Sequence, residues 1–165
     1  MELSRKERLI LCNQCLILEK LYPEDAESYA QTRKALEHGY ALHYSDLAQN
    51  IYEDELSEQE CQEVLDILNM YSFLTFAYKK LKDTEGIDEH RIKFDGFDGN
   101  SETSRMGYVR YFIKDLGRFQ ELDSGGDFNS HIQRLHRYQK MLREWQLSPD
   151  KFELTKNDII RITSA

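Results

Sequence analysis

Apolar residues recur at helical spacing from the start of the chain. Leu9, Cys12 and Leu16 are separated by three or four positions, as on one face of an α-helix. The preceding run Ser4-Arg5-Lys6-Glu7 has the form of a capping box, in which serine and glutamate side chains bind free amides of the first turn. The pattern therefore predicts a helix that begins at residue 5 and ends near Leu21.

A second helix follows after a very short turn. Pro23 suits a first helical turn, because that turn does not use the amide hydrogen that proline lacks. The helix is predicted to end near His38, with Gly39 in the left-handed conformation that closes many helices. Two helices joined so closely predict an antiparallel hairpin.

The middle of the chain predicts a long buried helix. A short helix over residues 45–52 is expected first, and Ser57-Glu58-Gln59-Glu60 then forms a second capping box. From Val64 the next helix is apolar on nearly every side until about Leu81. A helix of that kind is typical of the centre of a domain, where neighbours cover all its faces.

The remaining third of the chain predicts three further helices. They are expected at about residues 102–116, capped by Asn100 or Ser101, at about residues 130–145, and from Thr155 to about Ile162. No segment alternates apolar and polar residues as a half-buried strand would. The sequence thus predicts an all-α, multihelical protein: a hairpin lobe of residues 1–39 packed with a lobe of residues 40–165 around a central aromatic-rich helix.

Charge is distributed unevenly along the chain, and this distribution limits the kinds of partner that the protein can attract. Of the 165 residues, the first 87 contain 9 Lys+Arg and 17 Asp+Glu, which accounts for the whole net charge of −8. Such a surface disfavours long-range attraction of nucleic acid or anionic lipid. The longest apolar-rich stretch, residues 64–78, is also too short and too polar to span a bilayer. We therefore expect neither nucleic acid nor membrane as a partner.

Three cysteines, Cys12, Cys15 and Cys61, do not form a disulfide framework. Reduced thiols, together with the lack of a recognisable signal peptide, predict a cytoplasmic protein. Cys12-Asn13-Gln14-Cys15 has the spacing of a redox or zinc half-site, but it lies inside a predicted helix without a second ligand pair. We interpret both cysteines as core residues of the hairpin, and we expect no metal and no cofactor.

The outline of a helix-turn-helix occurs at residues 44–68, but its charge is wrong for DNA. Residues 53–66 contain seven acids and no lysine or arginine. This acidic 53–66 face is interpreted as a solvated surface or as a docking face for a basic protein partner. A basic stripe on the predicted 130–145 helix is its complement, within the subunit or across a homo-oligomer; the stripe contains Arg134, Arg137, Lys140 and Arg143.

Residues 94–112 contain more aromatic, glycine and charged residues than packing alone requires. Asp95, Asp98, Asn100 and Glu102 resemble a calcium loop, but counted from Asp98 the glycine and final glutamate of an EF-hand are missing. A helix beginning near Glu102 presents amides to an anion. The candidate ligand-binding residues in this region are Phe94, Phe97, Asp98, Arg105, Tyr108 and Arg110. No nucleophile or nucleotide-binding motif accompanies them, so no catalytic residue is predicted.

Several short runs resemble the YfbU family, a group of small bacterial proteins without an established activity. The most specific are Gly96-Phe97-Asp98 and Gly107-Tyr108-Val109-Arg110. The others are Arg8-Leu9-Ile10-Leu11 with Asn13-Gln14, Asp66-Ile67 with Met70-Tyr71, and Tyr138-Gln139 with Met141-Leu142 and Trp145. The resemblance implies an all-helical, cytoplasmic protein and brings no catalytic residue; the Cys-x-x-Cys does not resemble part of the family pattern.

Two functions from different classes are compatible with these observations. The first is a non-enzymatic, homo-oligomeric helical protein that acts through protein–protein contacts, as the missing catalytic motifs and the charge asymmetry indicate. The second is an enzyme or small anionic-ligand binder with a site around residues 90–110. There Asp98 would be the base and Arg110 would help to hold the anion.

Overall fold

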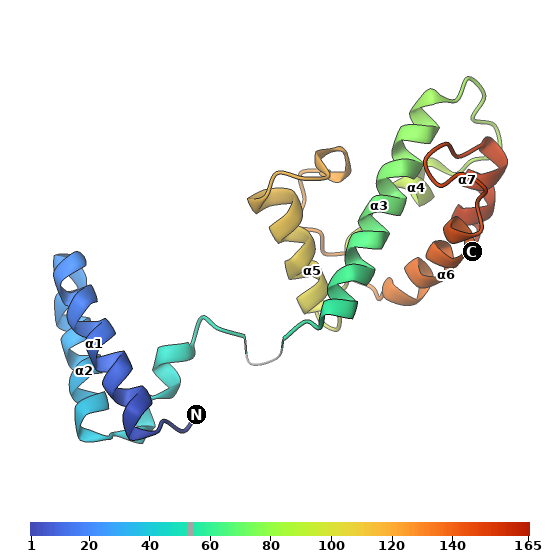
Figure 1. Ribbon diagram of the computed structural model, residues 1–165. Coiled ribbons are helices and arrows are strands. Elements are labelled where there is room, and N and C mark those ends of the chain that lie inside the picture. The colour runs from blue at the N-terminus through green and yellow to red at the C-terminus, as the bar shows by residue number, and fades with distance from the viewer. Residues whose placement is uncertain (53–54) are drawn as a thin grey trace. The chain divides into compact units, whose positions relative to one another are not determined.

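The computed structural model describes residues 1–52 and 55–165, and within them the fold is all-α (Figure 1). The chain divides into two compact units, Met1–Glu55 and Leu56–Ala165. No β-strand occurs in the described part of the chain; Phe97 and Asn129 form one isolated parallel bridge there. The predicted fold class is thus confirmed.

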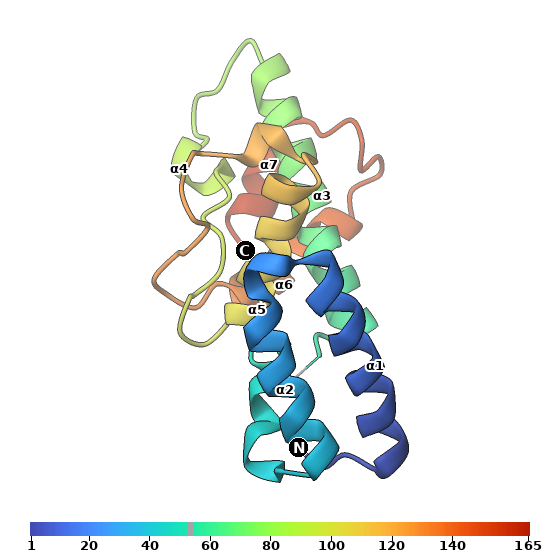
Figure 2. The same ribbon diagram turned by 90° about the vertical axis from the view of Figure 1, so that its left-hand side faces the viewer.

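The N-terminal unit is built on a helical hairpin. Helix α1 (Arg5–Leu21) and helix α2 (Ala26–His38) lie side by side, as Figure 2 shows. The predicted capping box is present, since the Ser4 side chain accepts from the Glu7 amide and the Glu7 carboxylate accepts from the Ser4 amide. Pro23–Asp25 forms a 3-10 turn before α2, and Gly39 closes α2 with a φ of 76°.

A small core holds this N-terminal unit together. Its buried hydrophobic residues are Cys12, Cys15, Leu36 and Tyr44. Tyr44 lies between two short 3-10 turns, Ala41–His43 and Ser45–Ala48. The helix expected over residues 45–52 is therefore only a 3-10 turn that ends at Ala48. The sequence placed the end of the hairpin lobe at residue 39, whereas the compact unit continues through these turns because Tyr44 packs into its core.

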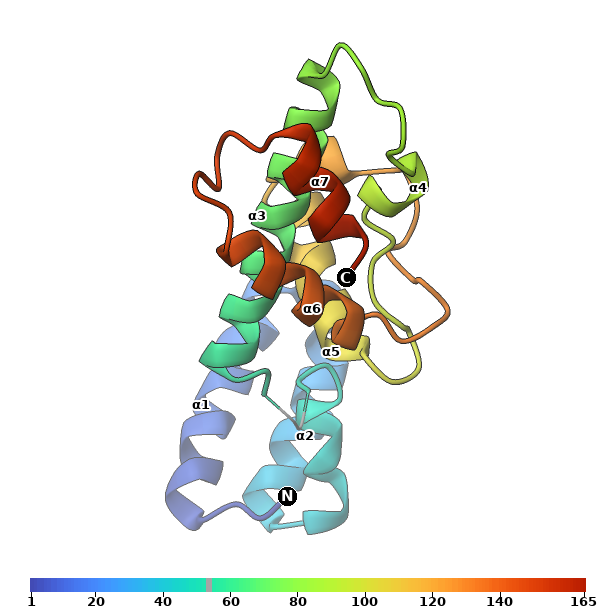
Figure 3. The ribbon, with the colours of Figure 1, turned by 90° about the vertical axis from the view of Figure 1, so that its right-hand side faces the viewer.

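The C-terminal unit is arranged around helix α3 (Glu58–Lys80), the longest helix of the chain (Figure 3). The second predicted capping box, Ser57 with Glu60, begins it. Four more α-helices contact α3 or one another around it: α4 (Glu89–Ile92), α5 (Thr103–Arg110), α6 (Leu135–Gln146) and α7 (Lys156–Thr163). Thr155 and Asp158 form a third capping box at the start of α7.

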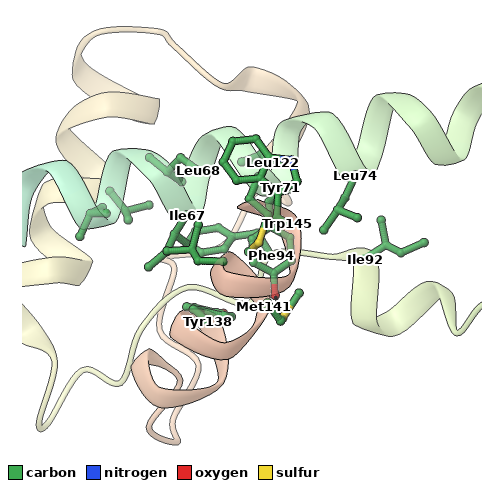
Figure 4. Close-up of a cluster of buried hydrophobic side chains, with 14 of the residues drawn as sticks. Ile67, Leu68, Tyr71, Leu74, Ile92, Phe94, Leu122, Tyr138, Met141 and Trp145 are labelled. Atoms are coloured by element: carbon green, nitrogen blue, oxygen red, sulfur yellow. Dashed lines mark hydrogen bonds between the residues drawn. The ribbon is translucent and has the colours of Figure 1, made fainter. Parts of the chain in front are cut away.

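Large side chains fill the space between α3 and its neighbours (Figure 4). Ile67, Tyr71 and Leu74 of α3 are fully buried there. The Tyr71 ring lies 5.3 Å from the Tyr138 ring, edge to face, and 5.3 Å from the Phe94 ring. Aromatic pairs with this geometry add to the stabilisation that burial alone provides.

Two of the later predicted helices differ from the structure. The helix expected at residues 102–116 is α-helical only over α5 and continues as a π-helical turn, Tyr111–Asp115. The helix expected at residues 130–145 begins only at Leu135. Before it, Phe128 and His131 have left-handed backbones with φ of 61° and 57°. Such angles are incompatible with a right-handed helix, so the chain turns there.

Within residues 1–52 and 55–165, no helix combines the length and the apolar character that are needed to cross a bilayer.

Candidate functional site

The segment singled out by the sequence, residues 94–100, is joined to a distant loop by backbone hydrogen bonds. The Phe97 amide donates to the Phe128 carbonyl at 2.9 Å, and the Ser130 amide donates to the Phe97 carbonyl at 3.0 Å. Gly96 has a φ of 87°, and a Cβ on it would lie 1.9 Å from the Phe128 carbonyl oxygen. Only glycine fits such an approach, so Gly96 is required by the architecture.

The two candidate phenylalanines belong to the core. Phe94 and Phe97 are 6% and 0% exposed, with ring centroids 6.0 Å apart in an edge-to-face pair. Both rings lie within 6 Å of the Tyr138 ring. The Tyr138 hydroxyl donates to the Gly96 carbonyl at 2.9 Å, which ties α6 to the glycine turn. These contacts hold both rings in the core, and Phe94 also contributes to the floor of a cleft described below.

Asp98 holds the turn that precedes α5. Its carboxylate accepts from the Ser101 hydroxyl at 2.6 Å and from the Asn100 amide at 3.3 Å. The hydrogen bond from Ser101 lowers the pKa of the Asp98 carboxyl, although burial opposes this shift. A carboxylate with a lowered pKa is a poorer general base at neutral pH. The geometry therefore favours a structural role for Asp98 over the catalytic one considered from the sequence.

Glu102 is the residue in this region whose importance the sequence did not reveal. It is 8% exposed, and its carboxylate accepts from the amides of Asp98, Arg134 and Leu135 at 2.9–3.1 Å. A carboxylate so placed caps the beginning of α6 from a different helix. The predicted caps, Asn100 or Ser101, do not bind the first amides of α5, whose cap position is occupied by Glu102. The only signal in the sequence was an acid next to a helix start.

Arg105 binds carboxylates in the acidic first part of α3, the acidic helix, and not an external anion. Its guanidinium lies 2.7 Å from the Glu60 carboxylate and 3.8 Å from that of Glu63, with 18% of the side chain exposed. Two carboxylates of the acidic 53–66 face are therefore paired within the unit. Glu53 and Asp54 of that face lie outside the described residues. Among the described residues, Glu55 and Glu58 are exposed and Asp66 is half-buried, and these are the carboxylates of the face that remain for the proposed basic partner.

The basic stripe divides between different contacts. Arg134 precedes α6 and pairs with Asp95 at 2.7 Å. Gln139, not an arginine, contacts the acidic helix, donating to Glu63 at 2.7 Å. Lys140 and Arg143 are exposed. The polar contact between α6 and the acidic start of α3 is thus made by a side-chain amide, while the cation that neutralises Glu60 and Glu63 comes from α5.

Tyr108 and Arg110 do not converge on Asp98. Tyr108 is half-buried, its ring stacks at 6.3 Å on Tyr111, and desolvation raises the pKa of its hydroxyl. The Arg110 guanidinium donates to the Asp127 carbonyl at 2.8 Å and lies 3.4 Å from the Asp127 carboxylate. The structure therefore brings Phe94, Phe97 and Asp98 together and directs Arg105 and Arg110 to separate acids.

The calcium-like carboxylates are likewise bound by protein groups. Asp95 pairs with Arg134, Asp98 binds the turn, and Glu102 binds backbone amides. Among the described residues, no group of three or more His, Cys, Asp or Glu side chains is arranged to hold a metal ion. The thiols of Cys12 and Cys15 are buried in the hairpin core, where desolvation raises the pKa of each and reduces its reactivity.

An open cleft of about 430 Å³ lies beside Phe94. Buried Ile92, Phe94 and Leu122 supply its apolar floor, and Lys79 and Lys93 are the cations in its lining. Its acids are partly engaged: Lys93 is 3.6 Å from Glu89, Lys114 is 2.7 Å from Asp123, and the Ser72 hydroxyl donates to Glu121. The cleft overlaps the predicted region through residues 92–94 only.

A second surface of note is the outer face of α1, which we define as the part of the helix surface that bears its exposed large hydrophobic residues. Its large hydrophobic residues are Leu9, Ile10, Leu16, Ile17 and Leu21, each between 46% and 64% exposed. The inner side of the same helix buries Cys12 and Cys15. Large apolar side chains gathered on one exposed helix face are typical of an interaction surface.

The family model of the YfbU domain matches residues 1–165. The resemblance noted in the sequence is therefore confirmed over its full extent.

Proposed function

The chain belongs to the YfbU family, and we propose that it is a cytoplasmic, non-enzymatic helical protein that self-associates and acts through protein–protein contacts. The outer face of α1 is the observation that carries this proposal. Five large hydrophobic side chains of that face are about half exposed or more, in a unit that buries only four hydrophobic residues. Burying such side chains against a partner removes apolar area from water at roughly 25 cal/mol per Å².

Other features support the same proposal. The sequence-predicted site residues are held in protein hydrogen bonds, ion pairs or aromatic contacts that explain their presence without a substrate. The three cysteines are free thiols, as in proteins of a reducing compartment. Association through the hairpin would also bury further apolar area in a unit whose core contains four buried hydrophobic residues. Small units commonly gain stability by oligomerisation.

The test is the mass of the full chain in solution. Sedimentation velocity over a hundredfold concentration range is expected to give an oligomer that dissociates on dilution. The double variant Ile10→Glu/Ile17→Glu is expected to be monomeric with an unchanged far-ultraviolet circular dichroism spectrum, since both side chains are solvent-exposed. Two carboxylates on the face would have to be desolvated in the interface.

A matched control separates loss of the interface from a general effect of added charge. Leu116 and Leu147 are 47% and 72% exposed and lie in the other unit, so Leu116→Glu/Leu147→Glu adds the same charge elsewhere. It is expected to retain the wild-type mass. A wild-type chain that is monomeric at every concentration and ionic strength contradicts the proposal, as does an outer-face variant that still assembles.

A second candidate function, binding of a small organic anion, is favoured by one observation. The cleft beside Phe94 combines an apolar floor with the ammonium groups of Lys79 and Lys93. No ion pair to Lys79 occurs among the described residues, which leaves this cation available. An apolar body with one carboxylate, such as octanoate or phenylacetate, matches these groups.

Titration calorimetry with octanoate and phenylacetate tests this candidate. Lys79→Gln is expected to weaken binding by about 1 kcal/mol, roughly fivefold, as for a partly exposed ion pair. The neighbouring residue Lys80 is exposed and does not line the cleft, so Lys80→Gln should bind as the wild type does. Absence of heat at millimolar ligand, or equal weakening in both variants, refutes the candidate.

A further inference from the structure

The outer face of α1 has an internally symmetric pattern of residues. Asn13 is exposed at its middle, and pairs of large aliphatic residues stand three and four positions away on both sides: Leu9 with Ile10, and Leu16 with Ile17. Exposed lysines, Lys6 and Lys20, follow at seven positions on both sides. Positions that differ by three, four and seven from a central residue share one face of an α-helix and form its contact patch where two helices cross.

From this pattern we infer that α1 pairs with α1 of a second copy of the chain, antiparallel, with the two-fold axis passing at Asn13. The inference rests on the proposed self-association and specifies its partner, orientation and register. A two-fold interface brings the same surface of both subunits together, and the surface must then be complementary to itself. A patch with aliphatic residues at three and four positions and lysine at seven positions on both sides of its centre meets that condition.

The arrangement fixes which side chains meet. At 100° per residue, Ile10 and Ile17 lie along one edge of the outer face, and Leu9 and Leu16 lie along the other edge. A two-fold axis perpendicular to the helix keeps each edge on its own side and reverses the direction. Ile10 therefore meets the partner's Ile17, and Leu9 meets the partner's Leu16.

Orientation follows from charge along the helix. The first turn of α1 carries the exposed cations Arg5 and Lys6, and the exposed acids Glu24 and Asp25 follow shortly after its C-terminal end. An antiparallel pair places the basic turn of one subunit near the acidic end of the other and opposes the two helix dipoles. A parallel pair would place the two basic first turns together and the acids Glu24 and Asp25 of the two subunits together, whereas positions 6 and 20 bring lysine against lysine in either orientation. Lys20 meets the partner's Lys6 at the rim, where long ammonium side chains extend into water.

Asn13 sets the register of the pair. In the centre of an apolar contact its side-chain amide is desolvated, and it is satisfied only by another hydrogen-bonding group. The partner's Asn13 supplies that group when the axis passes between the two amides. A shift by one turn would place Asn13 against an aliphatic side chain, which costs roughly 1–3 kcal/mol for an unsatisfied polar group.

Disulfide trapping in the full chain tests orientation and register together. The background is Cys61→Ser, because Cys61 is the half-exposed thiol while Cys12 and Cys15 are buried. Asn13→Cys alone is expected to form a covalent dimer under mild oxidation. A mixture of Ile10→Cys and Ile17→Cys proteins, after subunit exchange, is expected to cross-link, whereas either protein alone is not.

The geometric reason is the length of the helix between these positions. In the antiparallel pair, Ile10 and the partner's Ile10 are separated by about 10 Å along the axis at 1.5 Å per residue. Disulfides require Cα atoms within about 7 Å of each other. In a parallel pair, Ile10 would instead meet the partner's Leu9, so a mixture of Ile10→Cys and Leu9→Cys proteins serves as the matched control and should remain uncoupled.

The outcomes separate this inference from the proposal beneath it. A chain that sediments as a monomer overturns both. A dimer in which Ile10→Cys couples to Leu9→Cys overturns the antiparallel orientation, and a dimer in which no α1 position cross-links overturns the assignment of the face. When Asn13→Leu is added to these proteins, both the Ile10→Cys/Ile17→Cys mixture and the Ile10→Cys/Leu9→Cys mixture are expected to cross-link. If only the first mixture still cross-links, Asn13 does not set the register.

Discussion

The two units begin their principal helices with the same device and use those helices in opposite ways. Ser4 with Glu7 starts α1, and Ser57 with Glu60 starts α3, in both cases with reciprocal hydrogen bonds between side chains and amides. Helix α3 then buries residues on several sides, including Val64, Ile67 and Leu74. Helix α1 buries two cysteines and leaves its largest hydrophobic residues in contact with solvent.

This difference shows that local sequence determines a helix, whereas neighbouring elements determine what the helix does. In the C-terminal unit, helices α4, α5, α6 and α7 all contact α3 directly. Helix α1 packs against α2 and the turn before α2. An apolar helix with one neighbour has faces left over, and those faces are available to a partner. The comparison leads to four measurable predictions about how the units respond to change.

The largest effect is expected at the glycine turn of the C-terminal unit. Gly96→Ala must accommodate a Cβ placed 1.9 Å from a carbonyl oxygen, in addition to a φ of 87°. Left-handed strain and overpacking together are expected to destabilise the protein by about 5 kcal/mol. Urea denaturation measures this change.

Gly86→Ala is the matched control in the same unit. Gly86 has a φ of 79°, but nothing lies within 4 Å of its Cβ position. Gly86→Ala should therefore lower the free energy of unfolding by only about 1–2 kcal/mol, because it adds the left-handed backbone strain without a steric clash. Equal losses in the two variants would show that the close approach at Phe128 is not what demands glycine at residue 96.

The next largest effect is expected at buried leucines, and its size should differ between the cores of the two units. Leu74 of α3 and Leu36 of α2 are 0% and 1% exposed. Leu74→Ala should cost about 4 kcal/mol and Leu36→Ala about 2 kcal/mol, because a sparsely covered core collapses more readily around a cavity. Hydrogen exchange of peptides from each unit reports the two losses separately. A greater loss in the hairpin than around α3 would contradict the contrast between the cores.

A smaller effect is expected at the carboxylate that joins α5 to α6. Glu102→Ala removes the acceptor for the Asp98, Arg134 and Leu135 amides and should cost about 2–3 kcal/mol. Glu102→Gln keeps one acceptor oxygen and should recover about half of that loss. Protection of the α6 amides in hydrogen exchange is the readout. If both substitutions leave α6 protected, Glu102 does not cap that helix.

The smallest effect is a difference in acid sensitivity. Hydrogen bonds to Ser101 and to Thr155, and Lys114 beside Asp123, lower the pKa values of Asp98, Asp158 and Asp123 in the C-terminal unit; in the hairpin, Ser4 lowers the pKa of Glu7. A carboxyl with a lowered folded pKa adds stability above its unfolded pKa of about 4, and this stability is lost as pH falls through the folded pKa.

Stability of the C-terminal unit should therefore fall more steeply below pH 4 than that of the hairpin. Hydrogen exchange of peptides from each unit, between pH 5 and pH 2.5, measures how steeply the stability of each unit depends on pH. Asp158→Asn should flatten the slope of the C-terminal unit, and Glu7→Gln should not affect it. A hairpin that is the more acid-sensitive unit would reverse the expected order.

Several helix starts were predicted correctly from the sequence. The capping boxes at Ser4 and Ser57, and the start of the last helix at Thr155, lie where their side-chain patterns placed them, because such caps involve residues only three positions apart. The helix expected from residue 130 was wrong at its start. His131 adopts a left-handed backbone, and a carboxylate 33 positions away in sequence binds the Leu135 amide. No local pattern contains that information.

The sequence grouped the candidate residues in one region of the chain, but it did not predict their arrangement. Phe94, Phe97 and Asp98 do lie together, whereas Arg105 and Arg110 turn to Glu60 and Asp127. Spacing along a helix shows which side chains share a face, but it does not show which acid, from which other element, will occupy the space in front of them. The role of Glu102 was missed for the same reason.

By itself, the sequence determined the all-α class, the hairpin and the ends of several helices, since these depend on hydrogen bonds and apolar spacing within a few residues. The tertiary structure alone decided that Gly96 meets Phe128, that Glu102 caps a distant helix, and that α1 keeps an apolar face in solvent. Each of these depends on segments far apart in the chain, and only folding determines which of them meet.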